Sequence, residues 1–167
     1  MNITDEERLV IKSKLPNLDE LLFEGESKTY ERGFVSTLEH WTVGEDVDEI
    51  FPIDPVEISD RQYKFKNLIN HLYESTPIYT ARFRRDRRNS LSIKKIRSSE
   101  ILNKKCQFHM LNEDYGDVFR LIIPEYSLVY TQNYDWTHLI DYCNKEQCKS
   151  FRNLIEKFGL HWLEYIQ

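Results

Sequence analysis

After residue 77 the apolar side chains of this chain change from a helical spacing to a spacing of two, and this change most restricts the possible fold. The first run of this kind places apolar side chains at alternate positions: Tyr79, Ala81 and Phe83. The residues between them are polar or basic. A period of two is typical of a β-strand that buries one face. The sequence therefore predicts that a sheet begins here.

Further strand-like runs follow along the rest of the chain. They begin at Leu91 and Ile93, at Phe108 and Met110, over residues 118–123, over 128–130, over 137–142, and in the tail 160–166. Most of these runs are consecutive and are separated by short turn-like segments, which favours antiparallel neighbours. The alternating tail is predicted to pack back on the sheet as a last strand.

Helices are expected before and after this run of strands. Thr4 with Glu7, and Ser59 with Gln62, have the spacing of a capping box, and Asn17 stands where a second short helix begins, with Gly25 as its stop. Asn144 is placed to cap the last helix. Gly159 follows this helix. The apolar stripe of the helix has helical spacing and consists of Phe151, Leu154, Ile155 and Phe158.

These elements predict an α+β fold in one domain, residues 1–167. A largely antiparallel sheet of about five to six strands, from residues 78–142 and 160–166, is flanked by N-terminal helices and a C-terminal helix. Residues 1–77 are mainly helical, and residues 78–167 hold the sheet and the last helix. Between residues 26 and 58, positions 34–41 fit either a helix or a strand, and the acidic stretch 44–54 has the composition of a loop.

Composition favours a cytoplasmic protein. The first residues form no secretory signal, and no apolar run approaches the length of about 20 residues that a membrane helix needs. Three cysteines, an odd number, argue against a secreted disulfide framework. We therefore expect no membrane partner, and the sequence predicts no oligomeric state.

Charge is distributed unevenly along the chain. Residues 1–60 hold 16 acidic and 5 basic side chains, whereas residues 82–105 hold ten basic and two acidic ones. The basic segment is the candidate binding site, and its principal residues are Arg82, Arg84, Arg85, Arg87, Arg88, Lys94 and Lys95. It has three interpretations: a cationic arm that neutralises phosphates, a solvated sheet edge protected by Lys and Arg, and an internal match to the acidic first sixty residues.

One constellation has the residue types of general acid–base chemistry. His138 lies between Asp135 and Asp141 in sequence, and a histidine oriented by a carboxylate is the usual unit of proton transfer. Strand alternation would place His138 and Asp141 on opposite faces, and no nucleophile stands nearby. These three residues are weak catalytic candidates, and a structural histidine is the preferred interpretation.

The remaining motifs point to no cofactor and no metal. The chain has no glycine-rich nucleotide loop, no H-E-x-x-H and no G-x-S-x-G. Five side chains are candidate zinc ligands: Cys106, His138, Cys143, Cys148 and His161. The second close pair of ligands that a structural zinc site usually has is missing.

The leading functional hypothesis is a non-catalytic interaction protein that binds a charged macromolecule. The partner is expected to be a protein rather than a nucleic acid, because the net charge of −5 would repel phosphates over most of the surface. An inhibitor or immunity-type protein would fit, with its acidic surface in a basic enzyme cleft. The alternatives are a nucleic-acid-binding module that uses residues 82–105 and an enzyme centred on His138.

Overall fold

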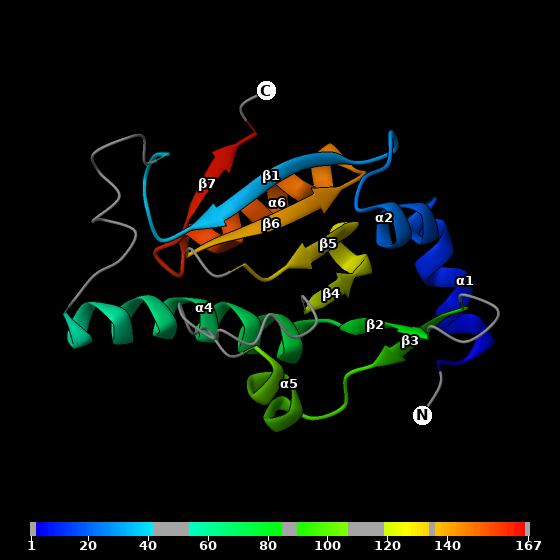
Figure 1. Cartoon of the computed structure of the whole chain (residues 1–167), viewed down its shortest axis with the longest axis horizontal. Coiled ribbons are helices and arrows are strands. Elements are labelled where there is room, and N and C mark those ends of the chain that lie inside the picture. The colour runs from blue at the N-terminus through cyan, green and yellow to red at the C-terminus, as the bar shows by residue number, and fades with distance from the viewer. Residues whose placement is uncertain (1–2, 42–53, 85–89, 107–118, 134–135, 166–167) are drawn as a thin grey trace.

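The structure is a computed structural model, and it describes residues 3–41, 54–84, 90–106, 119–133 and 136–165 (Figure 1). Within these ranges the side chains of residues 82–84, 90, 91 and 105 are not described. The elements in chain order are α1 (Asp5–Lys14), α2 (Leu18–Glu24), β1 (Glu31–Ser36), α4 (Pro55–Ser75), β2 (Tyr79–Arg84), β3 (Ser90–Lys95), α5 (Ser99–Lys105), β4 (Arg120–Ile123), the 3₁₀ turn η2 (Pro124–Tyr126), β5 (Leu128–Thr131), β6 (Thr137–Tyr142), α6 (Lys145–Glu156) and β7 (His161–Glu164).

One sheet joins all the described strands, and the predicted α+β fold is confirmed. Seven strands pair in the order β3-β2-β4-β5-β6-β1-β7, and every pairing is antiparallel. The prediction of about five to six strands was therefore low. The additional strand is β1, which overlaps positions 34–41, where the sequence fits either a helix or a strand. It pairs on both sides, with β6 and with β7.

Other departures from the sequence prediction lie at element boundaries. The long helix α4 begins at Pro55 rather than near Ser59, because the Asp54 side chain caps it by accepting a hydrogen bond from the Val56 N–H at 2.9 Å. Helix α5, capped by Ser98, was not predicted. The strand expected at Phe108 and Met110 lies outside the described residues.

The predicted capping interactions are present at two of the helices. Thr4 and Glu7 form both hydrogen bonds of a capping box at the start of α1, 3.1 and 2.9 Å long. Asn144 accepts from the Gln147 N–H at the start of α6. Asn17 differs: it precedes α2 in the left-handed region, makes no side-chain cap, and donates from Nδ2 to Thr29 instead.

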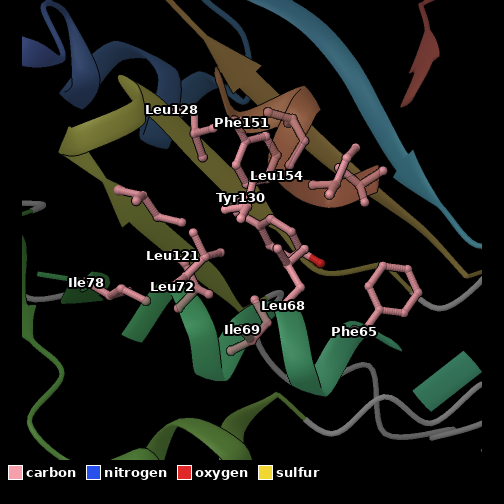
Figure 2. Packing of buried hydrophobic residues seen from close by; sticks show 14 of the residues in the cluster. Phe65, Leu68, Ile69, Leu72, Ile78, Leu121, Leu128, Tyr130, Phe151 and Leu154 are labelled. Atoms are coloured by element: carbon pink, nitrogen blue, oxygen red, sulfur yellow. The ribbon is translucent and has the colours of Figure 1, made fainter. Parts of the chain in front are cut away.

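Helices cover the two faces of the sheet unequally. On one face α4, α5 and α6 pack over alternate strand residues, and Figure 2 shows α4 and α6 side chains meeting those of β4 and β5. This larger cluster includes Phe65, Leu68, Leu121, Tyr130 and Phe151, all at most 1 % exposed. On the other face α1 and α2 cover the intervening residues, among them Ile122 and Val129. The central strands are therefore buried on both faces, which explains their nearly continuous apolar runs.

No helix in the described part of the chain combines the length and the apolar composition required to cross a bilayer.

The stripe of α6 gives a stability test. Phe151 and Ile155 are fully buried, Leu154 is buried and Phe158 is half-buried, as the spacing predicts. Leu154→Ala should lower the free energy of unfolding by about 2–5 kcal/mol, because it removes buried methyl groups and leaves a cavity. The exposed neighbour Lys157 is the control, and Lys157→Ala should leave thermal melting nearly unchanged. Similar losses in the two variants would contradict this packing.

Candidate functional site

The basic segment, residues 82–105, extends from the β2–β3 hairpin at one margin of the sheet to the end of helix α5. Arg82 and Arg84 belong to β2 through their backbone, but their side chains, like the whole of Arg85, Arg87 and Arg88, fall outside what the structure describes. Lys94 and Lys95 lie on β3, which is the outermost described strand on this side. Both lysine side chains are half-buried.

Lys95 connects this hairpin to the acidic N-terminal region. Its Nζ lies 2.8 Å from Glu7 Oε1, while the other oxygen of Glu7 accepts the Thr4 N–H in the capping box. The hydrogen bond from Lys95, together with the Thr4 backbone, lowers the pKa of Glu7, and the same contact raises the pKa of Lys95. One carboxylate thus both caps α1 and holds it to β3, so this lysine has an internal partner.

His138 lies in the core. It is 1 % exposed, its ring stacks on Phe65 with centroids 3.9 Å apart, and its Nδ1 is hydrogen-bonded to the Tyr130 hydroxyl. Burial lowers the pKa of His138 to about 3, so the imidazole is neutral at physiological pH. A general acid or base must reach a substrate, and this ring is enclosed by side chains.

Asp141 does not join His138 in a catalytic group. Asp141 lies three positions further along β6, on the opposite face of the sheet, where Arg32 Nε lies 2.9 Å from its Oδ1. Burial raises the pKa of Asp141, although the hydrogen bond from Arg32 opposes that shift. Asp135 lies outside the described residues.

The three cysteines lie apart from one another, and each belongs to the packing or the hydrogen bonding of the fold. Cys106 ends α5 and Cys148 lies inside α6, both buried. The Cys143 thiol donates to the Lys14 carbonyl, 3.2 Å away, and so helps to hold the end of α1 against the sheet. Among residues 3–41, 54–84, 90–106, 119–133 and 136–165, no three His, Cys, Asp or Glu side chains gather as metal ligands would.

The structure reveals an acidic groove that sequence reasoning did not identify. It has a volume of about 730 Å³ and lies where β1 begins and β6 and β7 end, beside α2. Six carboxylates and two cations line it: Glu20, Glu24, Glu26, Glu31, Asp141 and Glu164, with Lys28 and Arg32. Ser27 and three tyrosines complete the lining: Tyr30, Tyr142 and Tyr165. We call this the acidic groove.

Three of these carboxylates form ion pairs with basic side chains. Asp141 pairs with Arg32, Glu31 with Lys145 at 3.0 Å, and Glu164 with Arg152 at 2.6 Å. Glu20, Glu24 and Glu26 are exposed, and within the described part of the chain none of them forms an ion pair. The unmatched negative charge of the groove is therefore on the α2 side. Only the acidic excess of residues 1–60 signalled it in the sequence.

An arginine that stacks on an aromatic ring pairs with Glu164, one of the residues that line the groove. The guanidinium carbon of Arg152 lies 4.1 Å from the centroid of the Trp162 ring, and Arg152 Nη1 donates to the Glu164 carboxylate. Trp162 packs against the backbone of Gly33, so closely that a Cβ at Gly33 would lie 1.9 Å from the ring. The absence of a side chain at residue 33 permits this contact between the Trp162 ring and the backbone of β1.

A pH test follows from the burial of His138. The folded protein keeps this imidazole neutral down to about pH 3, whereas the unfolded chain protonates it near its ordinary value of 6.5. Stability should therefore fall as the pH falls from about 6.5 towards 3, by about 1.4 kcal/mol per pH unit from this group. In His138→Gln, urea unfolding should depend less on pH over this range. Tyr130→Phe keeps the buried imidazole and should retain the steeper dependence; equal slopes in all three proteins would contradict the assignment.

A second test concerns the contact of Gly33 with Trp162. Gly33→Ala should reduce stability by about 1–3 kcal/mol, because the new methyl group overlaps the ring. In a protein that already carries Trp162→Ala, the same change should have little effect. Thermal melting of the four proteins of this double-mutant cycle measures the coupling. An additive result would mean that the ring is not what excludes a side chain at position 33.

Comparisons of the chain with protein-family models, with curated proteins and with solved structures find no match.

Proposed function

We propose that this protein is a non-catalytic interaction protein that binds a positively charged surface of a partner protein through the acidic groove. The observation that carries the proposal is the lining of the groove, where six carboxylates face two cations. A cleft whose lining carries an excess of one sign of charge concentrates the field and raises the rate of encounter with an oppositely charged partner, by up to about 10- to 1000-fold.

The same charges argue for a protein partner. Nucleic acid carries one phosphate charge for each nucleotide, and the groove would repel it. The whole chain, at −5, adds to that repulsion. The basic segment 82–105 remains the alternative site for nucleic acid, although Lys95 is occupied by Glu7. A basic protein surface is the partner that the described charges favour.

The position of the candidate catalytic residues supports a non-catalytic role. His138 is enclosed in the core, and Asp141 lies on the other face in an ion pair with Arg32. A protein that binds without reacting needs only a complementary surface. An inhibitor or immunity-type protein of the cytoplasm, which covers a basic enzyme cleft with its acidic groove, is the form of this function that we propose.

The proposal is tested with a groove variant and a control of equal charge. The groove variant carries Glu20→Gln, Glu24→Gln and Glu26→Gln, and the control carries Glu74→Gln, Glu125→Gln and Glu156→Gln, all at exposed positions. Each protein is used as bait in a native lysate of the organism that makes it, and retained proteins and nucleic acids are identified separately. A partner found with the wild-type protein is then purified, and its affinity for all three baits is measured.

We expect a basic protein that binds the groove variant about ten-fold less tightly, because three exposed ion pairs contribute about 0.2–1 kcal/mol each. The control should bind like the wild-type protein. Equal weakening in both variants would assign the effect to net charge rather than to the groove. Recovery of nucleic acid alone, at equal levels with all three baits, would favour the basic segment instead.

A further inference from the structure

The face of β1, β6 and β7 that points away from α6 carries an apolar row without a helix over it. Phe34 on β1 lies directly opposite Leu139 on β6 and opposite Leu163 on β7. In Figure 1 α6 lies behind β1 and β6, and no helix of the described chain lies in front of them. Helices α1 and α2 cover this face only over the neighbouring strands.

Aromatic rings extend this row. The ring of Trp41 meets that of Phe34 edge-on, with centroids 4.8 Å apart, and the ring of Tyr165 lies nearly parallel to Phe34 at 6.2 Å. Phe34, Leu139 and Trp41 are half-buried, and Tyr165 is 50 % exposed. We call Phe34, Trp41, Leu139 and Tyr165 the aromatic face. Such clustered apolar side chains at a surface are typical of an interaction site.

The aromatic face is continuous with the acidic groove. Arg32 and Asp141 form the next row along β1 and β6, about 7 Å from Phe34 and Leu139, because every second residue of a strand shares a face. Tyr165 belongs to both surfaces, since it also lines the groove. One partner can therefore contact the apolar row and the carboxylates together.

The charge beside the aromatic face limits what can cover it. A second copy of the chain would bring like carboxylates together if the interface were isologous. An anionic lipid surface would be repelled for the same reason. A positively charged protein surface is complementary to the groove and can also bury the rings.

The molecule already holds a guanidinium with a ring and a carboxylate at this end of the sheet. Arg152 lies over Trp162 and donates to Glu164, the residue that precedes Tyr165. A planar guanidinium can stack on a ring and donate two parallel hydrogen bonds at once, whereas a lysine ammonium is a point charge that is more strongly hydrated. Rings next to carboxylates therefore favour arginine over lysine.

Building on the proposed function, we propose that the aromatic face binds arginine side chains of the partner, stacked on Phe34, Trp41 and Tyr165 and neutralised by the carboxylates of the acidic groove. The partner is then a protein that presents arginines, rather than lysines, on its basic surface. The aromatic face supplies the selectivity between the two cations, and the groove supplies the attraction to both.

Two labelled 12-residue peptides of equal charge serve as probes. They share a sequence of Gly, Ser and Leu in which four positions are arginine in one peptide and lysine in the other. Fluorescence anisotropy measures their affinity for the full chain at low and at physiological salt. We expect the arginine peptide to bind about five-fold more tightly. Tyr165→Ser, at an exposed position beyond β7, should remove this preference. Phe34→Thr keeps a residue suited to a strand and provides a second test of the same prediction.

The groove variant Glu20→Gln, Glu24→Gln and Glu26→Gln should weaken both peptides alike and keep the preference for arginine. Equal affinity of the two peptides for the wild-type protein would overturn the role of the aromatic face. In that case the proposed function would still stand if the groove variant binds both peptides less tightly than the wild-type protein does. Binding of neither peptide would overturn both proposals. A dimer in sedimentation that Tyr165→Ser dissociates would show that a second copy covers this face instead.

Discussion

The insertion of β1 between β6 and β7 is the constraint on which the rest of the structure depends. Without β1 the last strand would have no neighbour in the sheet, because β7 pairs with no other described strand. The acidic groove and the aromatic face both include residues of β1. Gly33 allows the Trp162 ring of β7 to pack against the backbone of β1, because a side chain at residue 33 would occupy the space of that ring.

The sheet also explains why polar chemistry is divided between two environments. The even-numbered residues of β6 face the helices α4 and α6, so His138 is enclosed and uncharged. The odd-numbered residues face the other way, and Asp141 there meets Arg32 at the margin of the groove. Residues that are close in the sequence thus lie in different environments, one in the apolar core and the other in an ion pair. The sequence predicts this difference only where the segment is recognised as a strand.

Much of the fold could be predicted where short-range patterns determine it. The spacing of Phe151, Leu154 and Ile155 identified α6, and Thr4 with Glu7 identified the start of α1, because both signals lie within one or two helical turns. Strand β1 could not be assigned in the same way. Its segment has a glycine and two charged residues, and its pairing partners lie far away in the chain. The short helix α5 lacks a clear apolar period.

The candidate site was less predictable than the fold, for a physical reason. The groove joins a helix near residue 20, the end of β6 near residue 141, and the last strand near residue 164. Such a surface exists only after tertiary packing, so no local motif encodes it. The acidic excess of residues 1–60 was a real signal, since Glu20, Glu24, Glu26 and Glu31 all belong to it. The basic segment is the more conspicuous feature of the sequence because its charges are close together along the chain.

Strand β1 is synthesised well before the two strands with which it pairs, and this order has a consequence for biosynthesis. Glu31 lies 111 positions before Tyr142, its partner in β6, and β7 is made later still. At about 5–20 residues per second, the ribosome needs on the order of 6–22 seconds to supply that partner. During this interval Phe34 and the unpaired backbone of β1 have no sheet to join. This segment of a newly made chain therefore stays unpaired until β6 has been made, and the acidic groove can form only after both β6 and β7 have been made.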